Sequence, residues 1–179
     1  MDSLPTILDN LSRAQTQLLS AADTVPAEQW RTSPGKNRWS AAELIAHLIT
    51  VEKSIVQRAD RITQNPPRRI PVFQRWHLPL ALVESRLVKR KSPLPQDPEL
   101  ICEKEAMLAG LRAARERTLA FIEETRGRDL SVYWHRHAFL GTLNLYEWFQ
   151  MIASHEIRHT KQMKEIAAGL PKAVVSLQK

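Results

Sequence analysis

The sequence predicts an all-α protein, a four-helix bundle with a long crossover between helices 2 and 3. Three observations favour this class. The chain of 179 residues has five glycines, its long segments are rich in the helix formers Ala, Leu, Glu and Arg, and runs of alternating apolar and polar residues are few. We expect a single domain over residues 1–171, followed by a short C-terminal tail, 172–179.

The composition is typical of one compact domain with a sizeable core, since 43% of the residues are hydrophobic and 25% are charged. The one cysteine, Cys102, has no partner for an intramolecular disulfide, and the N-terminal residues lack the features of a secretory signal. No run approaches the roughly 18 consecutive apolar residues of a membrane span. We therefore expect a cytoplasmic protein that does not enter the membrane.

The first two helices have clear sequence signals. The first should run from about residue 3 to residue 24, where Pro26 closes it. In the second, Ser40 and Glu43 form an S-x-x-E capping box, and Trp39 and Leu44 are spaced for the hydrophobic staple around it. The sequence thus predicts that the second helix begins near Ser40.

A histidine lies at the edge of the apolar face of this second helix. The face is formed at helical spacing by Leu44, Leu48, Val51, Ile55, Ala59 and Ile62. At about 100° per residue, His47 falls roughly 60° from Leu44, so its ring should point inward near the edge of the face. Taken alone, His47 is compatible either with a core histidine bonded to a carbonyl or with a metal ligand.

Residues 65–97 contain six prolines, which exclude one continuous helix. A short helix fits between them at about 80–89, so we expect a long crossover that makes the second and third helices parallel. Asp97 is spaced to cap the third helix, with Pro98 in its first turn, and Gly127 ends it. This helix is expected to supply core and no chemistry.

The crossover is also basic, and the chain carries a formal net charge of +7. The basic residues of this segment are Arg68, Arg69, Arg75, Arg86, Lys89, Arg90 and Lys91. They suit either an anionic partner or a solvated surface. We favour the solvated surface over a nucleic-acid partner, because no aromatic stacking pattern or nucleic-acid motif accompanies the charges.

Residues 128–141 show no clean period and predict a loop at one end of the bundle. This loop carries His135 and His137, two residues apart, which would suit adjacent ligation from an extended segment. Without a further partner, however, we expect both to be surface or hydrogen-bonding histidines. The same holds for His77.

The fourth helix carries a pair of candidate metal ligands. Asn144 and Glu147 repeat the capping arrangement, which predicts a helix over 145–169. On its wheel His159 lies about 40° and His155 about 80° from the centre of the apolar face, so both imidazoles project from one flank. Together with His47 on the facing helix, they predict a three-histidine site for one divalent metal ion.

Glu156 lies near the centre of the same apolar face, where a carboxylate needs a cation or a donor beside it. The proposed metal and its ligands would satisfy this need. The HExxH pattern of His155, Glu156 and His159 also suggests a zinc metalloprotease, in which the glutamate is the general base. That interpretation lacks a third ligand downstream, and a chance HExxH on a helix surface is a further alternative.

The whole pattern resembles the DinB-like, or YfiT-like, family of metal-binding four-helix bundles, from about Leu4 to Ala168. The resemblance rests on the segment WSAAELIAHLITVE around His47, on FLGTLNLYEW at 139–148, and on His155, His159 and Gln162, which match the family's HxxxHxxQ signature. It implies a bundle with a long crossover, the ligands His47, His155 and His159, and a nickel or zinc ion at one end of a cleft. It is also compatible with a homodimer.

Related bundles are described as thiol S-transferases that use bacillithiol or mycothiol, as thiol-dependent isomerases or as hydrolases, and many members have no assigned activity. We therefore expect a metal-dependent enzyme that activates a low-molecular-weight thiol for transfer to a small electrophile, with Glu156 accepting a proton or orienting a ligand and Gln162 supporting the site. The alternatives are a metal-dependent hydrolase that uses water, and a non-enzymatic protein that binds metal or nucleic acid.

Overall fold

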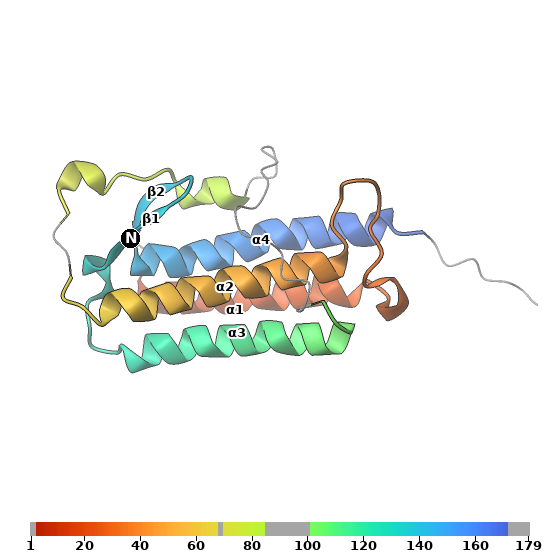
Figure 1. Cartoon of the computed structure of the whole chain (residues 1–179), viewed down its shortest axis with the longest axis horizontal. Helices are drawn as coiled ribbons and strands as arrows, with labels where there is room; N and C mark the ends of the chain where they lie inside the picture. Colours follow the sequence, from red (N-terminus) through yellow and green to blue (C-terminus); the bar gives the residue numbers. More distant parts are fainter. Residues whose placement is uncertain (1–2, 68–69, 85–100, 172–179) are drawn as a thin grey trace, which may run out of the picture.

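The computed structural model describes residues 3–67, 70–84 and 101–171, which form four long helices and a small two-stranded sheet. The helices are α1 (Leu4–Asp23), α2 (Ala41–Thr63), α3 (Lys104–Glu124) and α4 (Leu145–Gly169). They lie side by side along one axis (Figure 1). This confirms the predicted all-α four-helix class.

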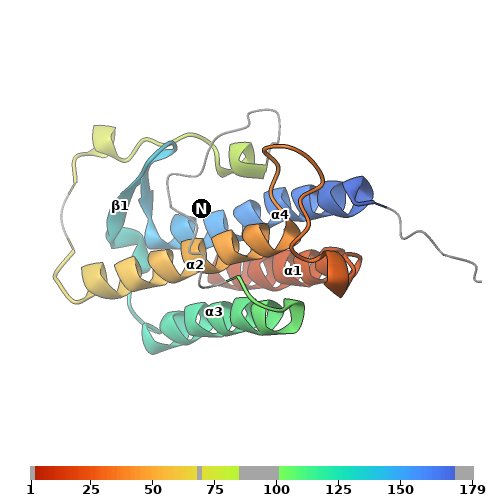
Figure 2. The same ribbon diagram turned by 45° about the vertical axis from the view of Figure 1, so that its right-hand side comes forward.

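The helices run in two opposite directions. α1 and α4 run one way and α2 and α3 the other, as both views of the bundle show (Figures 1 and 2). α1 packs chiefly on α4, and α2 packs on α3 and on α4. The parallel arrangement of α2 and α3 confirms the direction that the long crossover predicted.

Both predicted capping boxes are present. At the start of α2 the Ser40 hydroxyl accepts a hydrogen bond from the Glu43 amide at 3.2 Å, and the Glu43 carboxylate accepts one from the Ser40 amide at 2.7 Å. At the start of α4 Asn144 and Glu147 exchange the same bonds at 3.1 and 2.8 Å. These caps satisfy backbone donors that a helix leaves unpaired, and so define where each helix begins.

The predicted start of the third helix is wrong. Asp97 and Pro98 lie outside the described residues, but 101–103 are described and are not helical. Glu103 is the N-cap, with extended backbone angles (φ −67°, ψ 150°), and α3 begins at Lys104. Ile101 and Cys102, both partly buried, pack against the core before the helix starts.

The described part of the crossover contains two 3₁₀ helices, η2 (Val72–Gln74) and η3 (Leu80–Glu84), and η3 packs on α4. The predicted helix at 80–89 is therefore seen as a 3₁₀ turn through residue 84, and its remainder lies outside the described residues.

Arg75 is the one member of the basic segment that is described, and its guanidinium lies 5.3 Å from the centre of the Trp134 ring. Arg68, Arg69, Arg86, Lys89, Arg90, Lys91 and the tail 172–179 lie outside the described residues.

The predicted loop at 128–141 is in part a hairpin, and that prediction needs correction. After a 3₁₀ turn, η5 (Leu130–Val132), the strands β1 (Trp134–His137) and β2 (Gly141–Asn144) pair antiparallel. The crossover backbone crosses this hairpin so closely that a Cβ at Gly141 would lie 2.6 Å from the Trp76 carbonyl oxygen. Gly141 also has φ +107°, so glycine is required there on two counts. The strands are short and their support comes from a distant segment, so no local period reveals them.

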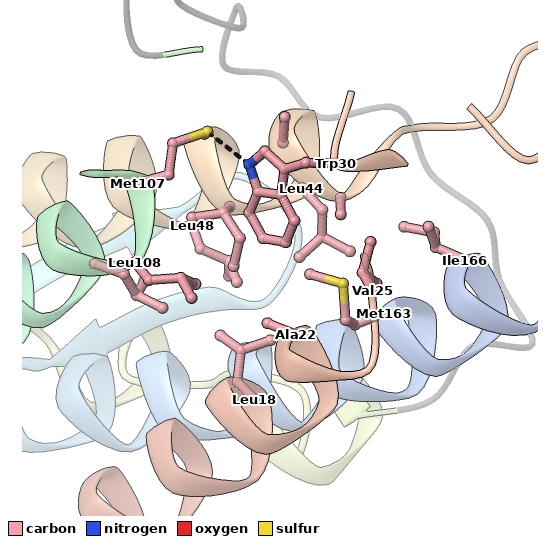
Figure 3. Close-up of a cluster of buried hydrophobic side chains, with 14 of the residues drawn as sticks. Leu18, Ala22, Val25, Trp30, Leu44, Leu48, Met107, Leu108, Met163 and Ile166 are labelled. Atoms are coloured by element: carbon pink, nitrogen blue, oxygen red, sulfur yellow. Dashed lines mark hydrogen bonds between the residues drawn. The ribbon is translucent and has the colours of Figure 1, made fainter. Parts of the chain in front are cut away.

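Two clusters of buried side chains fill the bundle. The first surrounds Trp30, whose indole N–H donates to the Met107 sulfur at 3.2 Å (Figure 3). The second contains Phe121 and Phe149, with ring centres 5.9 Å apart. On α4 the buried residues of the second cluster end at Ala153, with Ile157 packed against it, and those of the first begin at Met163, so His155 and His159 lie where the two clusters meet.

Within the described ranges, no helix combines the length and the apolar character needed to cross a membrane.

Candidate metal centre

His47 lies two turns into α2, on the side that faces α4. Because the capping box at Ser40 and Glu43 defines the first turn, the position of His47 on the buried face follows from the start of the helix. His47 is 6% exposed. The predicted inward orientation is observed.

His155 and His159 are one turn apart on α4, and their ring centres are 4.4 Å apart with the planes nearly perpendicular at 86°. His159 is 6% exposed and His155 is partly exposed. The His47 ring lies 5.2 Å from each of them. The three imidazoles that the sequence places on two separate helices therefore meet in one cluster, which we call the histidine triad.

The ring nitrogens of the triad converge. Nε2 of His155 lies 3.4 Å from Nε2 of His47 and 3.0 Å from Nε2 of His159, and all three residues offer ligand atoms within 4.8 Å of one another. Metal–nitrogen bonds of about 2.0–2.1 Å place two ligand nitrogens about 3.3 Å apart in a tetrahedral site and about 3.0 Å apart in an octahedral one. Two of the three nitrogen separations therefore match those around one divalent ion, and the third pair lies within 4.8 Å.

The triad is electrically neutral near pH 7. Burial lowers the pKa of His47 to about 4. Burial, followed by the neighbouring imidazole of His47, lowers the pKa of His155 to about 3, and burial with both neighbours holds the pKa of His159 well below its usual value. A neutral imidazole presents a lone pair, which is the form that binds metal.

Gln162 determines which nitrogen of His159 carries the proton. The Gln162 carbonyl oxygen accepts a hydrogen bond from Nδ1 of His159 at 3.0 Å. Since that oxygen has no proton to donate, Nδ1 is protonated and the lone pair is on Nε2, which faces His155. This is the arrangement in which a second residue orients a metal-binding histidine.

Trp39 lies beside two members of the triad. Its ring centre is 5.0 Å from that of His47 and 6.2 Å from that of His159, and it is nearly parallel to the His159 ring at 12°. Trp39 also packs against the first core cluster. The residue that the sequence suggests as a helix staple therefore also covers one side of the triad.

Glu156 is buried, as predicted, but the cation beside it belongs to the protein. Its Oε2 accepts a hydrogen bond from Nη2 of Arg115 at 2.9 Å, and the same guanidinium holds Glu52 of α2 through Nε at 2.7 Å. Burial raises the pKa of Glu156 to about 7, although Arg115 opposes this shift. Arg115 therefore supplies the positive charge that we expected from a metal ion.

Sequence reasoning missed Arg115 and Glu52, although a signal was present. Arg115 is four residues after Leu111 and three before Thr118, and Glu52 is four after Leu48 and three before Ile55. Each charged residue is thus in register with a buried helical face. The charged neighbours of Arg115 in RAARERT made it resemble a surface residue.

The remaining histidines lie beside the hairpin, and His137 is near enough to the triad to contribute to the lowered pKa of His155. His77 contacts the Glu147 carboxylate, His135 contacts the Arg58 guanidinium, and His137 accepts hydrogen bonds from the turn of the hairpin. We call His77, His135 and His137 the hairpin histidines. Their hydrogen bonds agree with the structural role expected of them.

Comparison with known proteins relates the whole bundle to a described family. The sequence matches the profile of the DinB superfamily over residues 10–163, a range that includes the triad and Gln162. It is also 28% identical over 148 residues to the uncharacterised protein YuaE of Bacillus subtilis (strain 168), an alignment that covers 82% of this chain and 88% of YuaE. The chain belongs to the DinB superfamily.

Proposed function

We propose that this protein is a metal-dependent enzyme that activates a low-molecular-weight thiol at the histidine triad for transfer to a small electrophile. The observation that carries the proposal is the convergence of three neutral imidazole nitrogens, with Nε2 separations of 3.0 and 3.4 Å. A three-nitrogen set leaves coordination positions open, as in catalytic sites and unlike closed structural ones. Nickel and zinc both suit imidazole ligands.

His47, His155 and His159 would hold the metal, which when bound lowers the pKa of a thiol or water beside it. Gln162 keeps His159 in the required tautomer. Trp39 covers one side of the triad, and the partly exposed His155 marks the side nearest to solvent. In the reaction the thiol proton passes to water, the thiol sulfur forms a bond to the electrophilic carbon, and the bond from that carbon to the leaving group breaks with its electron pair going to the leaving group. No cysteine of the protein is needed for this step.

A first experiment tests the metal site. Protein purified without an affinity tag is analysed for its elemental content, and we expect close to one nickel or zinc per chain. The His155→Ala variant should contain none, while His135→Ala, which alters a hairpin histidine, should keep the metal. A metal-free wild-type protein would remove the basis of the proposal.

A second experiment tests the reaction. Loss of a conjugable electrophile is followed with several small thiols and with water alone. Turnover that requires a thiol and disappears in His155→Ala supports the transferase. Turnover without thiol favours the metal-dependent hydrolase, and salt-sensitive DNA binding that survives in His155→Ala favours a non-enzymatic binder.

A further inference from the structure

A buried cluster of three charged side chains joins the helices of the bundle. The Arg115 guanidinium, from α3, bonds to both oxygens of Glu52 at 2.7 and 3.2 Å, to Oε2 of Glu156 at 2.9 Å, and to the Leu11 carbonyl of α1 at 2.6 Å. The three charged side chains are between 2% and 4% exposed. One side chain thus contacts all three other helices. We call Glu52, Arg115 and Glu156 the charged clamp.

The charged clamp is next to the triad on both helices that carry its ligands. Glu156 directly follows His155 on α4, and Glu52 is five residues after His47 on α2, which is about 7.5 Å along the helix axis. A shift of either helix relative to Arg115 therefore moves a ligand of the triad. The guanidinium is planar and its donors form a fixed fork, so it constrains direction as well as distance.

Stability alone is a poor explanation for this cluster. Taking charges out of water costs several kcal/mol per ion, and replacing a buried ion cluster by apolar side chains is often neutral or stabilising. A better explanation is that the charged clamp fixes the positions of the helices, because a metal site must hold its ligands within about 0.5 Å of the productive arrangement. The Thr118 hydroxyl further fixes Glu52 by donating to its Oε1 at 2.6 Å.

We infer that Arg115 is a positioning residue, which sets the separation of His47 from His155 and His159 by holding Glu52 and Glu156 together. The inference rests on the proposed metal site and adds Arg115 and Glu52, which no ligand motif contains. It gives Glu156 a role that differs from that of a general base. A base would affect turnover alone, whereas a positioning cluster affects metal binding through each of its three members.

The test uses Co²⁺ as the probe, because its visible absorption reports the geometry of its ligands. Arg115→Met removes the guanidinium group with its hydrogen-bond donors and leaves an unbranched apolar side chain. We expect Co²⁺ affinity to fall by roughly 10- to 100-fold, the range typical of lost outer-sphere support, with a changed absorption band. The matched control is Phe121→Leu, also buried on α3, which should lower the unfolding free energy and leave affinity and band unchanged.

Glu52→Gln serves as a second variant in case Arg115→Met does not fold, because it keeps the shape of the side chain and removes one charge. It should also weaken Co²⁺ binding and change the band. Unchanged affinity and band in the folded clamp variants would overturn the inference, as would equal changes in Phe121→Leu. If the wild-type protein binds no Co²⁺, nickel or zinc, the proposed function fails and takes this inference with it.

Discussion

The three hairpin histidines and the three of the triad differ in the atoms that their ring nitrogens face. Nδ1 of His77 lies 2.9 Å from the Leu78 carbonyl oxygen, and its Nε2 lies 3.0 Å from the Glu147 carboxylate. In the triad, by contrast, Nε2 of His155 faces two other imidazole nitrogens. The ring nitrogens of the hairpin histidines contact hydrogen-bonding groups of other residue types, whereas those of the triad face one another.

The other two hairpin histidines also have structural partners. Nδ1 of His137 accepts hydrogen bonds from the Phe139 and Leu140 amides, both at 3.1 Å, and so closes the turn of the hairpin. The rings of His135 and His137 lie 5.7 and 5.2 Å from the Trp148 ring. These contacts hold the hairpin on the start of α4.

The sequence spacing of two histidines therefore says less about a candidate metal site than the groups that their ring nitrogens contact. His135 and His137 are close in sequence, yet they serve the hairpin. His47 and His155 are 108 residues apart, yet their nitrogens meet. A cation bound at the triad would accept a lone pair from each imidazole, whereas the ring nitrogens of the hairpin histidines already contact other groups of the protein.

The largest expected difference between the two groups is in metal affinity. His47→Ala removes the proposed ligand that comes from α2, and we expect affinity to fall by more than roughly 100-fold, because loss of outer support alone typically costs 10- to 100-fold. His135→Ala should leave affinity within about twofold of wild type. Competition with a chelator of known affinity measures both. Equal losses in the two variants would contradict the distinction between the groups.

A smaller effect is expected at Gln162, which supports the triad without being a ligand. Gln162→Leu leaves Nδ1–H of His159 without its acceptor, so both nitrogens compete for the proton and metal affinity should fall by about 10- to 100-fold. Gln162→Glu keeps an acceptor in reach and should bind metal at least as tightly as wild type. The same chelator competition measures both variants. Weakened binding in Gln162→Glu would show that the hydrogen bond is not the cause.

Local patterns in the sequence predicted much of this molecule. The starts of α2 and α4 follow from capping boxes that each span four residues, and helical periodicity places His155, His159 and Gln162 on one flank. The inward orientation of His47 follows from the same reasoning. These features depend on residues within a turn or two of each other, which is the range over which a single sequence is informative.

The features that were missed depend on contacts between distant segments. The start of α3 is displaced because Ile101 and Cys102 pack on the core. The hairpin depends on the crossover backbone at Trp76, and the charged clamp depends on α2, α3 and α4 meeting at Arg115. In each case the deciding partner lies tens of residues away, where no local period can identify it.

The smallest expected effect is at His77, and it separates stability from metal binding. His77→Ala removes contacts with the Glu147 carboxylate and the Leu78 carbonyl, and we expect the unfolding free energy to fall by about 1 kcal/mol, typical of a hydrogen bond. The reduction is modest because the His77 and Glu147 side chains are 22% and 18% exposed, and water replaces part of what is lost. Denaturant unfolding of the metal-free protein measures it.

Metal affinity should be unchanged in His77→Ala, because Glu147 keeps its capping bond to the Asn144 amide at 2.8 Å and α4 still begins at the same residue. The register of His155 and His159 on that helix is then preserved. If His77→Ala loses metal as well as stability, the crossover contributes to the geometry of the triad. The two groups of histidines would then act as one unit through α4.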